Sequence, residues 1–275
     1  MNSQQHPSDK KSGDIVLKVS GKVFSKITES KVPDVFVHPE DPNTLVWRYM
    51  DFAKFISMLE NQGIFFARTD QLGDRFEGSV PLQNRTNWKE HYEQIPLPET
   101  LKKDIIDDFS CTNLANLKWM FVNCWHMNHC ESAAMWKNYA QSDKAICVQS
   151  TFAKLKECLS PSESIDDVQL SVVRYLDYDA GTQPEGNIYF PFLHKRESFA
   201  HEKELRAIIH IQEDRRNGDP PEGLWRHLDL GKLIERIYVA PTSPKWFVEL
   251  VHQVVKKYCL GVDIYHSSLD KDPVY

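Results

Sequence analysis

Short apolar segments of strand type alternate with amphipathic segments of helix type along most of this chain of 275 residues. Residues 44–49 (TLVWRY) have the composition of a buried strand, and Asp51 follows as an N-cap before apolar residues at helical spacing. Gly63 is predicted to end that helix as its C′ residue, and residues 64–68 (IFFAR) return as a strand. This interleaving favours a mixed fold.

The same alternation continues along the rest of the chain. Further strands are predicted at residues 118–125, 145–149, 170–178, 205–211, 234–240 and 262–266, helices at residues 131–141 and 244–258, and one or two surface helices between residues 88 and 109, broken at Pro96 and Pro98. No linker and no internal repeat interrupts these segments. The predicted fold class is α+β, a single mixed α/β domain with a central, largely antiparallel sheet.

The first residues of the chain differ from the rest in composition. Residues 1–14 are rich in Ser, Gln, Lys and Asp and have no periodic apolar positions, so we expect a flexible N-terminal tail. Residues 15–24 (IVLKVSGKVF) alternate loosely and are predicted to form an edge strand. The single globular domain is accordingly placed at residues 15–275.

Composition and charge restrict the class of protein. A hydrophobic content of 41% is enough to bury a substantial core, and no apolar run reaches the roughly 18 to 20 residues of a membrane helix. We therefore expect no membrane partner and a cytoplasmic location. The net charge of -6 gives no global basic excess, so nucleic-acid binding would require a local basic patch. The sequence does not determine the oligomeric state.

Polar side chains at the end of the first strong strand form one candidate site. Arg48 and Tyr49 stand directly before the predicted helix N-terminus, where backbone N–H groups gather. The planar guanidinium of Arg48 suits a phosphate or a carboxylate ligand. An Arg at a strand end that pairs with a surface acid is the alternative interpretation.

A second candidate is the loop of residues 70–79 (DQLGDRFEGS), which follows the next strand. Its glycines permit tight turns, and Asp74 and Glu77 supply charge on a loop that a rigid scaffold can hold against a ligand. The alternative is a solvated turn that Phe76 anchors in the core.

The third candidate is the segment of residues 195–206 (KRESFAHEKELR), which begins with the ligand-binding candidate Lys195. If a strand begins near Glu202, strand alternation places Glu202, Glu204 and Arg206 on one face and an apolar row on the other. Paired carboxylates can divide the roles of general acid and base, and Arg206 can keep one of them ionised. An exposed charged strand face is the alternative.

Potential metal ligands also gather at the end of the strand at residues 118–125. Cys124, His126, His129 and Cys130 lie within seven residues. Structural zinc sites draw their ligands from two separated turns, so we expect no metal here. A nucleophile–base pair of Cys124 and His126 is also disfavoured, because residues two apart on a strand do not reach each other by default.

Taken together, three segments resemble a large prokaryotic family of uncharacterised single-domain proteins, and the resemblance runs from Leu45 to Ser268. They are LVWRYMDFAKFISMLENQGIFFARTDQLGDRFEGS, CWHMN followed by ESAAMWKNYA, and FLHKRESFAHEKELRAII. The shared pattern is an Arg-Tyr strand, an Asp-x-x-Glu loop, a Met-Trp helix and a Glu-x-Glu-x-Arg strand.

The order of these motifs is also similar, more distantly, to that of the ADP-ribosyltransferase fold. This resemblance implies that Arg48 binds a dinucleotide, that Tyr139 or Trp136 walls a nicotinamide pocket, and that Glu204 or Glu202 stabilises an oxocarbenium-like state. The chain departs from that pattern because it lacks a Ser-Thr-Ser segment and has Arg-Tyr where a His-type first motif is common.

The leading hypothesis is an enzyme that consumes NAD and transfers ADP-ribose to a macromolecular acceptor, nucleic acid or protein, as a toxin or antiphage defence effector. A fixed carboxylate would stabilise the growing positive charge, and Glu204→Gln would abolish turnover with the fold intact. One alternative is a magnesium-dependent nuclease in which Asp74, Glu77, Glu202 and Glu204 hold the metal beside Lys195. Another is a non-enzymatic nucleotide-sensing or interaction module.

Overall fold

The computed structural model describes residues 15–19, 22–27, 34–139, 142–160, 168–212, 216, 218–271 and 273–274. The chain forms two compact units, Met1–Asp34 and Val35–Tyr275. In the first unit, β1 (Ile15–Val19) and β2 (Lys22–Ile27) pair antiparallel, so the prediction of one strand over residues 15–24 is wrong. The tail predicted at residues 1–14 lies outside the described residues.

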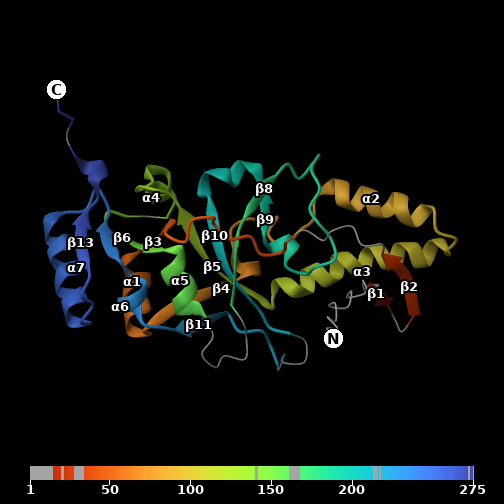
Figure 1. The fold of residues 1–275 in the computed structure, drawn as a ribbon, viewed down its shortest axis with the longest axis horizontal. Helices are drawn as coiled ribbons and strands as arrows, with labels where there is room; N and C mark the ends of the chain where they lie inside the picture. Colours follow the sequence, from red (N-terminus) through yellow and green to blue (C-terminus); the bar gives the residue numbers. More distant parts are fainter. Residues whose placement is uncertain are drawn as a thin grey trace, which may run out of the picture. The chain divides into compact units, whose positions relative to one another are not determined.

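The second unit contains the strands and helices that build the central sheet and its covering layers (Figure 1). In chain order they are β3 (Leu45–Asp51), α1 (Phe52–Glu60), β4 (Gly63–Arg68), η1 (Thr69–Gln71), α2 (Leu82–Glu93), α3 (Glu99–Leu117), β5 (Met120–Met127), α4 (Ala133–Tyr139), β6 (Ala145–Thr151), α5 (Phe152–Leu159), β7 (Gln169–Val172), β8 (Arg174–Leu176), η2 (Phe190–Phe192), β9 (His194–Arg196), η3 (Glu197–Glu202), β10 (Glu204–His210), β11 (Gly223–His227), α6 (Leu230–Leu233), β12 (Arg236–Val239), α7 (Lys245–Lys257), β13 (Asp263–His266) and η5 (Ser268–Asp270).

The central sheet has nine strands in the order β11-β4-β5-β3-β6-β12-β13, with β10 paired to β5 and β7 paired to β10. Every described pair in it is antiparallel except β12 with β13. The mixed α/β class with a largely antiparallel sheet is therefore confirmed. A separate short parallel pair joins β8 and β9.

Most strands and helices predicted from the sequence are present, with shifted ends. The long strand predicted at residues 170–178 is divided into β7 and β8 at Val173, whose N–H donates to the carbonyl of Glu204. The two surface helices α2 and α3 are separated by the segment that holds Pro96 and Pro98, as expected. The short elements α5, α6, β9 and β11 were not predicted.

The helix α1 ends before Gly63, so the prediction of Gly63 as its C′ residue is wrong. Asn61 is the C-cap, Gln62 takes the left-handed conformation with φ 44°, and Gly63 begins β4. The glycine is needed for a different reason. A Cβ at this position would lie 2.4 Å from the carbonyl oxygen of Arg226, on the paired strand β11.

Gly63→Ala is therefore expected to lower the free energy of unfolding by about 1–3 kcal/mol, the usual cost of forcing an atom into a closely packed backbone. Urea denaturation measures the change. Gly73→Ala is the matched control, because a Cβ at residue 73 meets nothing within 4 Å. Equal stability of the two variants would contradict the close approach of β11.

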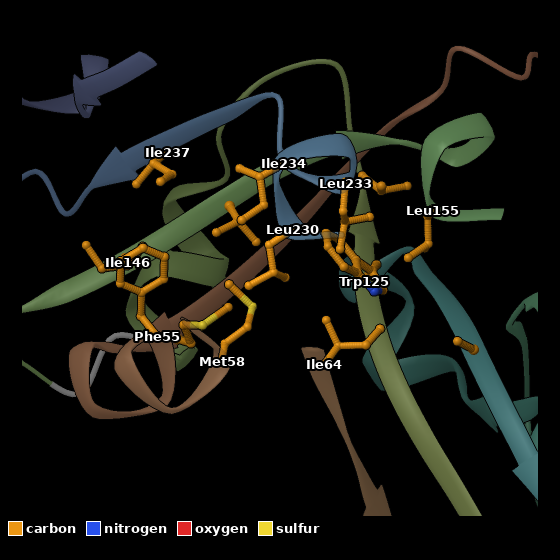
Figure 2. Close-up of a cluster of buried hydrophobic side chains, with 14 of the residues drawn as sticks. Phe55, Met58, Ile64, Trp125, Ile146, Leu155, Leu230, Leu233, Ile234 and Ile237 are labelled. Atoms are coloured by element: carbon orange, nitrogen blue, oxygen red, sulfur yellow. The ribbon is translucent and has the colours of Figure 1, made fainter. Parts of the chain in front are cut away.

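The main hydrophobic core lies on one face of the sheet, under α1, α5, α6 and α7. Figure 2 shows side chains from the helices, including Phe55, Met58 and Leu155, turned toward strand residues such as Trp125 and Ile146. The apolar residues of β10 belong to this core, as strand alternation predicts: Leu205, Ala207 and Ile209 have no exposed surface. The opposite face of β10 carries Glu204 and Arg206 together with the buried Ile208.

The sheet forks along one edge of β5. Strand β10 pairs with β5 over Met120–His126, whereas the other edge of β5 pairs with β4 at Phe121 and Val122 and with β3 only at His126 and Met127. Between these two pairings, β3 and β4 diverge on the same edge of β5 and leave a gap, and side chains bridge it. Asn123 Nδ2 donates to the carbonyl of Phe65 (2.8 Å), and Arg48 Nη1 donates to the carbonyl of Cys124 (2.9 Å).

Candidate active site

A cavity of about 990 Å³ lies at this fork. Most of the residues selected from the sequence line it, although they come from separate strands, loops and a helix. These are Arg48, Tyr49, Asp74, Glu77, Tyr139, Lys195, Glu202 and Glu204. Two others lie outside the lining. Trp136 packs in a small core with Trp47 and Tyr49, and Arg206 is fully buried behind Glu204.

The cavity reaches through the fork rather than resting on one face of the sheet. Cys124 and Trp125 both line it, although neighbouring side chains on a strand point to opposite faces. Met58 of α1 belongs to the core side, and Glu204 of β10 belongs to the other. The fork therefore provides a site that no continuous sheet could hold.

Lys195 joins the two carboxylates of the third motif. Its Nζ lies 2.6 Å from Glu202 Oε2 and 2.9 Å from Glu204 Oε2, and all three side chains are nearly buried. Burial opposes the charge on Lys195, but Glu204 and Glu202 outweigh it and raise the pKa of the ammonium above its usual value. The lysine is thus held in its charged form between two acids.

The two carboxylates converge for a reason that strand alternation did not supply. Glu202 is the last residue of the 3-10 segment η3, and β10 begins at Glu204, so the prediction of a strand from Glu202 is wrong. Lys203 between them has φ 40° and ψ 53°, a left-handed conformation in which the chain turns sharply. This turn brings both carboxylates to one ammonium.

Arg206 forms the buried base of the cluster. Its Nε lies 2.6 Å and its Nη2 3.1 Å from the carboxylate oxygens of Glu204, its Nη1 pairs with Glu77, and the same Nη1 donates to the carbonyl of Phe192 (2.5 Å). Burial alone would raise the pKa of Glu204, but Arg206 and Lys195 outweigh it and hold that pKa well below its usual range. The alternative of an exposed charged strand face is therefore wrong.

Glu77 lies on the other side of Arg206, and its position explains the Asp-x-x-Glu loop. It is 5% exposed, and burial outweighs Arg206 and raises its pKa. Asp74 instead pairs with Arg196 (2.8 Å), whose guanidinium stacks over the Phe76 ring at 4.2 Å. Phe76 is 42% exposed, so the expectation that it anchors the loop in the core is wrong.

Aromatic side chains hold Glu202 from the helix side of the cavity. Tyr139 Oη donates to Glu202 Oε1 (3.2 Å), and burial raises the pKa of Tyr139, which keeps its proton in place. Tyr49 Oη accepts from the backbone N–H of Ser132 (2.9 Å) and so fixes the start of α4. Trp136 supports this arrangement by packing edge-on against Tyr49 at 5.0 Å.

Arg48 differs from the other arginines of the site. Its Nη1 donates to the carbonyl of Cys124, and no carboxylate of the described residues is in salt-bridge contact with it. Burial lowers the pKa of its guanidinium. The alternative of a surface ion pair is thus not what the structure shows, and Arg48 is left facing a cavity with unused donors.

His126 and Cys124 line the cavity too, and sequence reasoning weighed them only as a metal or nucleophile set. Burial, with Glu204 nearby, raises the pKa of the Cys124 thiol, which keeps it neutral. Within the described ranges, no group of three or more His, Cys, Asp or Glu side chains is placed to hold a metal ion. The signal that could have found His126 is its two-residue spacing from Cys124, which puts both on the cavity face of β5.

Comparisons with known proteins give only distant likenesses, and these are to solved structures. No family model and no curated protein matches the chain, so the family resemblance stays a prediction. Among solved structures, DarT of Thermus sp. 2.9 in complex with NAD+ aligns with 86% of this chain and 100% of its own at 9% identity, with a TM-score of 0.39. The same protein in complex with carba-NAD+ aligns over the same shares at 10% identity and a TM-score of 0.38. This likeness is too distant to assign a function.

None of the described helices combines the length and the apolar character needed to span a bilayer.

Proposed function

We propose that this chain is an ADP-ribosyltransferase-like enzyme that consumes NAD and transfers ADP-ribose to a macromolecule, nucleic acid or protein. The observation that carries the proposal is the placement of Glu202. Its carboxylate lies at the wall of the cavity, held by Lys195 on one oxygen and by Tyr139 on the other. Arg206 engages Glu204 from the buried side, which leaves Glu202 as the carboxylate available to a ligand.

A fixed carboxylate suits the chemistry of this transfer. As the bond between nicotinamide and ribose breaks, its electron pair leaves with nicotinamide and positive charge grows on the ribose. A carboxylate that is already oriented stabilises that charge without reorganisation, and more strongly where water is excluded. Glu202 is 8% exposed, so it has this environment.

The rest of the cavity suits a dinucleotide. A volume of about 990 Å³ lies at the upper end of the range of roughly 300–1,000 Å³ for ligand sites. Arg48 supplies a planar donor fork for a phosphate, and the aromatic rings of Tyr49, Tyr139 and Trp225 line the walls. These features support a role for Arg48 in holding the pyrophosphate.

The nuclease alternative is less well supported, because its carboxylates are already engaged by cations. Asp74 pairs with Arg196, Glu77 with Arg206, and Glu204 with both Arg206 and Lys195, so three of the four carboxylates of that hypothesis already have cationic partners. A magnesium ion would have to displace these partners. No comparable observation favours the sensor alternative over the transferase, and the same experiment separates them.

The test is mass-spectrometric detection of nicotinamide released from NAD by the purified protein, alone and with DNA, RNA or cell lysate. We expect release that rises with the correct acceptor and is lost in Glu202→Gln. NAD that binds without release under any condition would favour the sensor, and release that requires no Glu202 carboxylate would contradict the assigned role.

A further inference from the structure

His126 is a buried side chain with an unused hydrogen-bonding atom at the cavity. It lies on β5, is 2% exposed, and lines the cavity beside Tyr49, whose ring centroid is 6.2 Å from its own. Its Nε2 has no hydrogen-bond partner among the described residues. Since buried polar atoms are almost always paired, an orphaned nitrogen at a cavity wall points to a ligand partner.

The tautomer of His126 follows from its other ring nitrogen. Nδ1 lies 2.6 Å from the backbone carbonyl oxygen of Glu202, which can only accept, so Nδ1 carries the proton. Neutral imidazole then has a lone pair on Nε2, which makes that atom an acceptor. Burial lowers the pKa of His126, and the nearby charges of Lys203 and His201 lower it further. The Glu202 carbonyl and carboxylate act in the opposite direction but do not outweigh burial. The neutral ring is therefore the form present at neutral pH.

The position of His126 ties this acceptor to the catalytic carboxylate. Its cross-strand partner on β10 is Glu204, and the same ring binds the backbone of Glu202. A ligand group that donates to Nε2 is therefore fixed relative to both carboxylates through short, rigid contacts. Glu202 and Glu204 already accept from Lys195, whereas Nε2 of His126 has no partner among the described residues.

We propose that His126 Nε2 accepts a hydrogen bond from an N–H or O–H group of the bound NAD and so orients the glycosidic bond against Glu202. The inference rests on the proposed function and makes His126 a residue that binds and positions the substrate. In the half of NAD that carries the bond to be broken, two groups have the required chemistry, the nicotinamide carboxamide and a ribose hydroxyl.

Two variants of His126 separate the role of Nε2 from that of Nδ1. His126→Asn puts an amide near the position of Nδ1, where it can still donate to the Glu202 carbonyl, but leaves nothing at Nε2. His126→Gln puts a carbonyl oxygen near Nε2 and restores an acceptor. We expect kcat/KM for nicotinamide release to fall about 10- to 100-fold in the Asn variant, the cost of one lost hydrogen bond at a buried site, and to be partly rescued in the Gln variant.

Nicotinic acid adenine dinucleotide, which has a carboxylate in place of the carboxamide, distinguishes the two donors. If the carboxamide donates to Nε2, preference for NAD over this analogue shrinks in the Asn variant. If a ribose hydroxyl donates, both substrates lose activity equally. NAD binding is measured by calorimetry and the melting temperature is measured for each variant, so that a loss of folding is recognised.

The outcomes separate this inference from the proposed function. A wild-type protein that neither binds nor cleaves NAD would overturn both. An active wild type whose Asn variant is equally active, or whose Gln variant is as impaired as the Asn variant at unchanged melting temperature, would overturn the acceptor role of His126 alone.

Discussion

Arg206→Met is expected to lower the free energy of unfolding by about 3–5 kcal/mol, enough to leave much of the protein unfolded, because it leaves buried carboxylates without their cation. Arg206 has no exposed surface and contacts both Glu204 and Glu77, which are 3% and 5% exposed. Methionine fills a similar volume but supplies no cation. Urea denaturation measures the loss, and Arg85→Met on the exposed surface of α2 is the control, with an expected change within about 0.5 kcal/mol.

The pH dependence of this loss has a definite sign. In the wild type the depressed pKa of Glu204 contributes stability that is present above its unfolded-state pKa and is lost as pH falls through the folded-state value. Arg206 is the charge that most strongly lowers the pKa of both Glu77 and Glu204, so without it both pKa values rise and both carboxyls take up protons more readily. The deficit of Arg206→Met should therefore shrink between about pH 7 and about pH 5. A deficit that grows with acid would contradict the ion network.

Glu202→Gln is expected to lower kcat for nicotinamide release by about 10²- to 10³-fold, the usual loss when one group that stabilises transition-state charge is removed. Glutamine keeps the shape of the side chain. Its carbonyl oxygen can still accept from Lys195, and its NH2 group can donate to the Tyr139 hydroxyl, which is able to accept. NAD affinity and melting temperature should change little. Steady-state kinetics of nicotinamide release with calorimetric NAD binding separate the two effects.

The matched control is Glu197→Gln, at the exposed first residue of the same 3-10 segment, which should retain wild-type activity. Glu204→Gln should behave differently from Glu202→Gln, because Glu204 balances both Arg206 and Lys195. We expect it to lose stability as well as turnover, which revises the earlier expectation of an intact fold. A Glu204→Gln variant that is inactive but fully stable would return the catalytic role to Glu204.

The strands of the core could be predicted because their apolar side chains recur at every second residue, the period of a β-strand. Leu205, Ala207 and Ile209 share one face of β10, and strand alternation correctly placed Glu204 and Arg206 on the other. The alternation could not be extended back to Glu202, because Lys203 adopts a left-handed conformation that its residue type does not favour. No local pattern distinguishes such a lysine from an ordinary strand residue.

Features that depend on a distant strand were the ones missed. Gly63 looked like a helix stop, although it is required by the backbone of β11, whose half-buried sequence GLWRH gives little periodic signal. The depth of Arg206 and the orphaned nitrogen of His126 likewise arise from the packing of segments far apart in the chain. Residue types identified the candidates, whereas tertiary contacts gave them distinct positions.

The fork in the sheet has a consequence for how the molecule avoids misassembly. A gap inside a sheet exposes strand edges, and exposed edges recruit other strands by backbone pairing. Here the Asn123 amide and the Arg48 guanidinium occupy carbonyls of β4 and β5 that an intruding strand would need. The two side chains therefore block backbone pairing in the gap, while the cavity between the strands keeps room for a small molecule.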